Sequence, residues 1–160
     1  MRTIVVGLGN PILSDDSVGI KVAALVKQAI PENAGVDVVE AYAGGLRLME
    51  AIAGYERAII VDAMKTGLHK PGTVQMLSLE SLTKTRNTLC THDGDLSTAL
   101  ALGSDLGLAL PGLVEIMGIE ADDVESFSEE LSSGVSMALP LAVADILCRC
   151  GIFESEYTID

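Results

Sequence analysis

The sequence predicts one α/β domain, in which helices cover both faces of a mainly parallel, twisted sheet of about five strands in a three-layer α/β/α arrangement. The chain has 160 residues, the length of a single domain. Short apolar runs alternate along it with segments whose apolar residues recur at helical spacing, and this alternation is typical of α/β folds. The runs are apolar on both faces, which indicates strands that are covered on both sides.

Five segments are expected to be strands. Residues 3–9 (TIVVGLG) form an unbroken apolar run, and residues 57–61 (RAIIV) form another, which ends at Asp62. Residues 73–79 (TVQMLSL) alternate in polarity, as a strand at a sheet edge does, and this strand is the one that can run antiparallel. The other two strands are expected at residues 36–40 and 113–119.

Four helices are expected, at residues 17–30, 46–53, 96–108 and 135–150. Pro31 ends the first, Gly54 closes the second, and Pro140 favours a kink in the last. Residues 80–94 and 120–132 are expected to be long loops, and the second of these is acidic. We expect the domain to span residues 1–151 and residues 152–160 to form a loose acidic tail.

Composition excludes several classes of function. The net charge is −13, from 10 basic and 23 acidic residues, so the chain should repel nucleic-acid phosphates and anionic lipid. No apolar run reaches the roughly 18 residues of a membrane span, and the N-terminus lacks the pattern of a signal peptide. The three cysteines match no metal or redox spacing, which is typical of a reducing compartment. We therefore expect a cytoplasmic protein without nucleic-acid or membrane partners; its oligomeric state is unknown from the sequence.

The loop after the first expected strand contains G-x-G and then two adjacent acids, Asp15 and Asp16. A dinucleotide fingerprint would need a third glycine where the chain has Ile12, and two acids would repel a phosphate there. Acids at a helix start commonly accept hydrogen bonds from its free N–H groups. We expect one of the two acids to cap the helix and the other to have a separate function.

Asp62 is the stronger candidate for chemistry. It closes a buried strand, so its carboxylate is expected at the carboxyl end of the sheet, where α/β proteins bind ligands. In a flavodoxin-type strand order, the strands that precede Asp16 and Asp62 are neighbours at the switch point. His92 lies in a long loop before a helix and can reach the same edge. Together the three residues form an oxygen–oxygen–nitrogen set that suits nickel, zinc or iron.

Alternatives stay open from the residues alone. Asp62 could serve only as an acceptor for a neighbouring turn. Cys90, two residues before His92, could form a nucleophilic dyad with it, although a buried thiol fits Cys90 better. A non-enzymatic metal- or nucleotide-binding assembly module is the competing function.

Four motifs occur in a fixed order along nearly the whole chain. They are G-x-G-N with an acid pair and a glycine (Gly7, Gly9, Asn10, Asp15, Asp16, Gly19), Ile60-Val61-Asp62-Ala63, His92 before a helix, and Gly118-Ile119-Glu120 before a loop and a final helix. In this order and spacing the chain resembles the nickel–iron hydrogenase maturation endopeptidases.

The resemblance implies a cytosolic endopeptidase that removes a short C-terminal peptide from the hydrogenase large-subunit precursor after nickel insertion. By this resemblance Asp16, Asp62 and His92 are the nickel-contacting and catalytic positions. The nickel would be supplied by the precursor, which is the implied partner, and would not reside in the protein.

Overall fold

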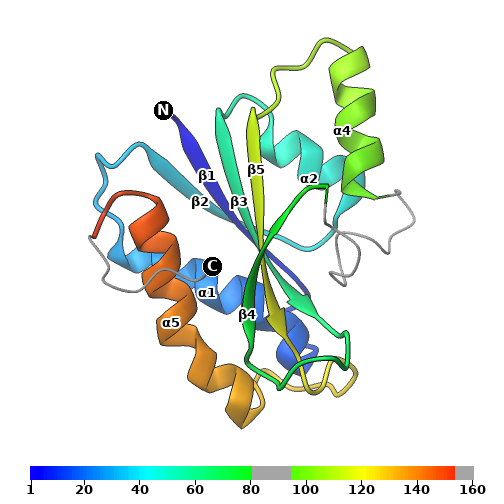
Figure 1. Ribbon diagram of the computed structural model, residues 1–160, viewed down its shortest axis with the longest axis vertical. Helices are drawn as coiled ribbons and strands as arrows, with labels where there is room; N and C mark the ends of the chain where they lie inside the picture. Colours follow the sequence, from blue (N-terminus) through cyan, green and yellow to red (C-terminus); the bar gives the residue numbers. More distant parts are fainter. Residues whose placement is uncertain (81–94, 154–160) are drawn as a thin grey trace.

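Five strands form one sheet in the order β2-β1-β3-β5-β4 in the computed structural model of the chain (Figure 1). The structure describes residues 1–80 and 95–153. Its elements are β1 (Thr3–Leu8), the 3-10 turn η1 (Ser14–Ser17), α1 (Val18–Ala29), β2 (Val36–Ala41), α2 (Gly45–Ile52), β3 (Arg57–Met64), β4 (Val74–Ser78), α4 (Leu96–Asp105), β5 (Leu113–Glu120) and α5 (Ser133–Arg149).

The strand directions confirm the expected mainly parallel sheet. β1, β2, β3 and β5 run parallel, whereas β4 pairs antiparallel with β5 at the edge. The part of the order that reads β2-β1-β3 makes β1 and β3 neighbours, as the flavodoxin-type arrangement requires.

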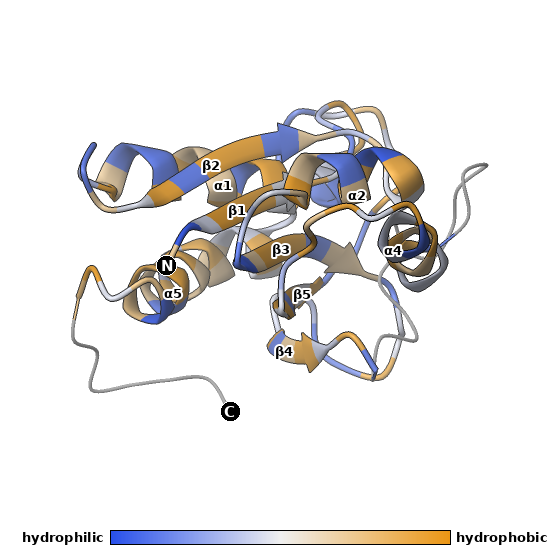
Figure 2. Cartoon of the chain, turned by 90° about the horizontal axis from the view of Figure 1, so that it is seen from above, coloured by the Kyte–Doolittle hydropathy of each residue, from blue (hydrophilic) through white to orange (hydrophobic). Residues whose placement is uncertain are grey.

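Helices cover both faces of the sheet, with α1 and α5 on one side and α2 and α4 on the other (Figures 1 and 2). Side chains of a strand alternate between its two faces. Ile59 and Val61 accordingly pack in the core with α1 and α5, and Ala58 and Ile60 pack in the core with α2 and α4. Apolar residues on both faces of β3 therefore fix its central position, which explains the uninterrupted apolar run in the sequence.

One difference from the expected boundaries bears on the site. β3 continues to Met64, so Asp62 lies inside the strand and does not close it. The reason is the register: β1 pairs with β3 only as far as Val61, whereas β5 pairs with β3 through Met64. Asp62 thus lies where the pairing of β3 with β1 has ended and its pairing with β5 continues.

The remaining boundaries agree within a few residues, apart from α4, which ends at Asp105 and not at 108. The expected loop at residues 80–94 and the expected acidic tail fall mostly on residues 81–94 and 154–160, which lie outside the described residues. Within the described ranges no helix is long and apolar enough to cross a membrane.

Charged side chains gather at the opposite end of the sheet from Asp62, where β3 and β5 begin. Glu115 accepts from Arg57 at 2.6 Å and from Arg149 at 3.2 Å, and Arg149 also binds the buried Asp145 at 2.7 Å. These pairs join β3 and β5 to α5. These ion pairs hold α5 against the amino end of the sheet. Ligands of α/β proteins bind at the other end, where the strands have their carboxyl ends.

Candidate functional site

Asp62 is fully buried at the carboxyl end of β3. Because side chains alternate along a strand, it lies on the same face as Ile60, toward α2 and α4. Its Oδ1 accepts a hydrogen bond of 2.9 Å from the backbone N–H of Ala63. At this position the backbone of β3 no longer pairs with β1 but still pairs with β5. The Asp62 carboxylate therefore lies at the switch point of the sheet.

Asp16 is also buried, with 2% of its surface exposed, and belongs to η1. Its backbone carbonyl accepts from the N–H of Asn10. A Cβ on Gly9 would lie 2.1 Å from this carbonyl oxygen, so the close approach of the loop to Asp16 requires a glycine at position 9. The G-x-G-N stretch therefore has a steric function: it seats the turn that carries Asp16 against the end of β1.

A second close approach holds the start of α1 against two strands. A Cβ on Gly19 would lie 2.2 Å from the carbonyl oxygen of Val61 in β3 and 2.5 Å from that of Leu8 in β1. The backbone of η1 also lies close to that of β3. The structure thus brings Asp16 and Asp62 to the carboxyl ends of neighbouring strands.

Asp15 has a different role from the one expected of it. The N-cap residues of η1 and α1, Leu13 and Ser17, make no side-chain capping bond, and the four hydrogen bonds that the Asp15 carboxylate accepts do not come from the first helix. The buried Asp15 carboxylate reaches across to the segment after β5, where it accepts from the backbone N–H groups of Asp122, Asp123 and Ser132 and from the Ser132 hydroxyl, all at 2.8–2.9 Å. Asp15 therefore fastens residues 121–132 to the turn that carries Asp16.

Further bonds join the same two segments. Ser14 has a φ of 39°, a left-handed conformation that is uncommon outside glycine. Its N–H donates to the carbonyl of Ser128 at 2.8 Å, and its hydroxyl donates to the carbonyl of Glu130 at 3.1 Å. The strained backbone is thus held by partners on the neighbouring segment, as expected of strain close to a functional site.

The segment at 121–132 is ordered by its own acidic side chains as well. Hydrogen bonds from the hydroxyl and N–H of Ser126 and from the N–H of Glu125 lower the pKa of Asp123 to about 2. At the start of the segment, the buried Glu120 accepts from the N–H and hydroxyl of Thr66. In Figure 1 the segment crosses the end of the molecule where β3 and β5 end.

His92 and Cys90 lie outside the described residues, so the three-residue metal set and the cysteine dyad both stay predictions. Within residues 1–80 and 95–153, no group of three histidine, cysteine or acidic side chains could hold a metal ion. Among the described residues, four buried carboxylates lie at the carboxyl end of the sheet: Asp15, Asp16, Asp62 and Glu120. Asp15 and Glu120 bind the segments around them, and Asp16 and Asp62 supply carboxylate oxygens that suit metal binding or general-base catalysis.

Sequence reasoning missed the function of Asp15 and of its partner Ser132. Their bonds join positions more than a hundred residues apart, and no local pattern marks them. The only signal was the adjacent acid pair itself, which indicated two different functions without indicating where the structural acid binds.

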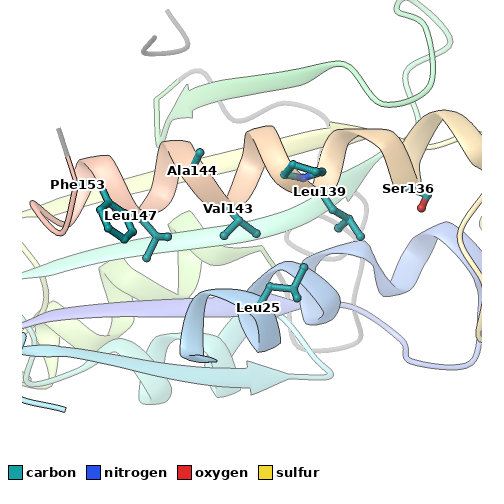
Figure 3. Close-up of a pocket in the computed structure, with 8 residues that line it drawn as sticks. Leu25, Ser136, Leu139, Val143, Ala144, Leu147 and Phe153 are labelled. Atoms are coloured by element: carbon teal, nitrogen blue, oxygen red, sulfur yellow. The ribbon is translucent and has the colours of Figure 1, made fainter. Parts of the chain in front are cut away.

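A separate pocket of about 530 Å³ lies between α1 and α5 (Figure 3). Leu25 of α1 faces Leu139, Val143 and Leu147 of α5 across it, and Phe153 closes one end. Among the described residues its lining contains no acid, base or metal ligand, and it is separate from the candidate site.

Comparison with known proteins agrees with the geometry. The family model described as hydrogenase maturation protease matches residues 3–149. Among curated proteins, the hydrogenase 2 maturation protease of Escherichia coli strain K12 is 25% identical over 126 residues, which cover 78% of this chain and 76% of that protein. The hydrogenase expression/formation protein HupD of Rhizobium leguminosarum bv. viciae is 23% identical over 144 residues, covering 89% and 70%.

Solved structures show the same fold. The hydrogenase maturating endopeptidase HybD from Escherichia coli superimposes with a TM-score of 0.77 at 23% identity, covering 93% of this chain and 91% of that one. The [NiFe] hydrogenase maturation protease HybD from Thermococcus kodakarensis gives 0.71 at 27% identity, covering 90% and 95%. These matches favour the protease over the non-enzymatic module. With a family model matched from the first strand to the last helix, the chain belongs to the hydrogenase maturation protease family.

Proposed function

We propose that this protease removes a short C-terminal peptide from the large-subunit precursor of a nickel–iron hydrogenase, in the cytoplasm, after nickel has been inserted. Membership of the family supports the reaction class. The relative from Thermococcus kodakarensis is named a [NiFe] hydrogenase maturation protease, which supports the choice of substrate. Nickel is cargo of the precursor in this proposal and not a resident cofactor of the protease.

The observation that carries the proposal is the burial of Asp16 and Asp62 at the carboxyl ends of two neighbouring strands. Two carboxylates at one edge of the sheet supply oxygen donors for a metal ion that a bound precursor brings there. Nickel suits carboxylate and imidazole donors. Asp16 and Asp62 would contact the nickel, with His92 as the third contact, and would thereby test whether nickel is present before cleavage.

Contact with the nickel would also place the scissile bond. Hydrolysis adds the oxygen of water to the peptide carbonyl carbon, breaks the C–N bond and passes a proton to the leaving amine. A carboxylate of the pair can take the proton from the attacking water, or the nickel can polarise the carbonyl or activate the water. Either route needs Asp16 and Asp62 at their observed edge of the sheet.

The test is shortening of the nickel-loaded precursor on a gel. Asp62→Asn replaces a charged carboxylate oxygen with an amide nitrogen at nearly constant volume. Cleavage should fall at least ~10–100-fold, because loss of a residue that only supports a metal ligand already lowers metal affinity or activity by this factor. Asp145→Asn is the matched control, since Asp145 is an equally buried carboxylate at the opposite end of the sheet. It should retain cleavage at temperatures where it is folded.

Two further samples separate the alternatives. The Cys90→Ala variant should cleave the precursor at the wild-type rate. If Cys90→Ala is inactive while Asp62→Asn is active, the nucleophile is the Cys90 thiol and the metal mechanism is refuted. Nickel-free precursor should stay full-length, and its complete cleavage would refute nickel recognition. If the wild-type protein leaves nickel-loaded precursor intact, the assembly-module function takes the place of the protease.

A further inference from the structure

Two loops at the carboxyl end of the sheet are joined edge to edge. The N–H of Ser128 donates to the carbonyl of Ile12 at 3.0 Å, and Ser14 returns a bond of 2.8 Å to the Ser128 carbonyl. Leu13 and Ser128 form an isolated β-bridge between these bonds. The Asp15 carboxylate adds four more bonds just behind this contact. Residues 10–14 and 126–130 therefore form one stiff rim beside the turn that carries Asp16.

Two large apolar side chains stand out of this rim. Phe127 is 83% exposed and Ile12 is 49% exposed, and their backbones are neighbours through the Ile12–Ser128 hydrogen bond. Phe127 is one of only two phenylalanines in the chain, and most of its apolar surface stays exposed to solvent in the folded protein. Single exposed apolar residues are ordinary, but two on a rigid rim next to a candidate active site indicate a contact surface.

The charge around the rim specifies what can dock there. Asp122, Glu125, Glu129 and Glu130 are exposed and flank Phe127 in the sequence, and residues 120–132 contain no lysine or arginine. Among the residues that the structure describes, the one cation bonded to this segment is Lys65, which donates to the carbonyl of Asp122, so acidic charge prevails near Phe127. A second copy of this chain would present the same acidic rim, and like charges brought together across an interface oppose association. An apolar side chain flanked by basic residues fits both features of the surface.

We propose that Ile12 and Phe127 form a docking rim for the precursor, which receives an apolar side chain flanked by lysine or arginine. This proposal rests on the proposed function, because the rim matters only if the precursor is the substrate. The rim lies beside the turn that carries Asp16, so docking on it holds the precursor at the end of the sheet where the buried carboxylates lie. Docking energy that is the same before and during the reaction lowers KM and leaves kcat unchanged.

The experiment compares Phe127→Ala, Ile12→Ser and the double variant with the wild-type protein. Phe153→Ala is the control, because Phe153 is a phenylalanine 58% exposed beside the α1–α5 pocket (Figure 3). It follows the C-terminal end of α5, which lies at the other end of the molecule from the segment after β5 (Figure 1). Two quantities are measured with purified nickel-loaded precursor: its Kd by surface plasmon resonance, and kcat and KM for its shortening. All four variants are exposed-site changes, so their thermal midpoints should match the wild type.

Phe127→Ala should raise both Kd and KM about tenfold, the effect of losing one central contact residue, with kcat unchanged. The double variant should weaken binding further, and Phe153→Ala should bind as the wild type does. Because the rim is acidic, the wild-type Kd should also rise with salt.

The outcomes keep the two proposals apart. A precursor that binds through Phe127 but is never shortened refutes the proposed protease function and leaves the rim intact. Wild-type cleavage with an unchanged Kd and KM in Phe127→Ala refutes the rim alone. The rim is equally refuted if the wild type binds no precursor, if Phe127→Ala lowers only kcat, or if its one effect is to dissociate a dimer of this chain.

Discussion

Replacing Asp15 by alanine should remove much of the stability of the fold. The substitution deletes the acceptor for three backbone N–H groups and one hydroxyl, and it leaves these donors partly buried without a partner. Hydrogen bonds to a charged group contribute about 1.5–3 kcal/mol each when measured alone, and an unsatisfied buried donor costs about 1–3 kcal/mol. These values do not add within one network. We expect a loss of about 3–5 kcal/mol, the size seen when a buried polar network is broken.

Urea unfolding followed by far-ultraviolet circular dichroism measures this loss. With a slope of about 2 kcal/mol per molar for a domain of this size, the midpoint should fall by about 2 M. The slope itself should stay the same if the folded state keeps its extent of burial. A domain with a total stability of about 5–15 kcal/mol would still be folded in buffer at low temperature.

Two variants isolate the cause. Asp122→Ala removes an exposed carboxylate from the same segment but keeps the N–H that Asp15 binds, so it should change the free energy of unfolding by no more than about 0.5 kcal/mol. Ser132→Ala removes only the hydroxyl partner and should cost about 1 kcal/mol. A midpoint for Asp15→Ala equal to that of Asp122→Ala, or one fully explained by Ser132→Ala, would refute the idea that the three backbone bonds stabilise the fold.

Three further predictions concern other parts of the chain. Gly19→Ala places a Cβ 2.2 Å from a backbone carbonyl and should cost at least the ~1–3 kcal/mol of overpacking in urea unfolding, whereas Gly112→Ala meets no atom within 4 Å and should cost almost nothing; equal midpoints would contradict the close approach. The pKa of Asp123 is lowered to about 2 in the fold, mainly by Ser126, so its contribution to stability is complete above its ordinary pKa near 3.8 and is lost as pH falls toward 2. The urea midpoints of wild type and Asp123→Asn should therefore converge between about pH 4 and pH 2, and a difference independent of pH would count against the shift. Burial raises the pKa of the Cys150 thiol, so iodoacetamide should label it more slowly at pH 8 than a free thiol, and urea should abolish the difference; labelling at the free rate in the folded protein would disprove the burial.

The fold was largely predictable because its signals are local. An apolar run such as residues 57–61 predicts a strand covered on both faces, whatever its partners are. The end of that strand was not predictable, because it depends on pairing with Gly118, Ile119 and Glu120, which lie more than fifty residues away. Polarity alone predicted the strand end at the first acid, Asp62, although a carboxylate can be accommodated inside a strand where the pairing with one neighbour has ended.

The placement of the two candidate acids was predictable for the same reason, whereas their function stays a prediction. Asp62 could be located because an acid beside a buried strand is conspicuous, and the strand order makes β3 the neighbour of β1, which precedes Asp16. The contacts of Asp15 could not be predicted, because the donors belong to the backbone of Asp122, Asp123 and Ser132. Backbone donors exist at almost every position, so the sequence does not indicate which of them a given carboxylate binds.

The form of η1 explains how two adjacent acids can have different functions. Two neighbouring carboxylates in one environment would repel each other and raise each other's pKa. A 3-10 turn has three residues per turn, so successive side chains point about 120° apart. Asp15 is thereby directed to the N–H groups of residues 122–132, and Asp16 is directed to a different side of a turn that contacts β3. The two positions are not interchangeable, because a shift of one residue in this turn would point the structural acid away from its four donors.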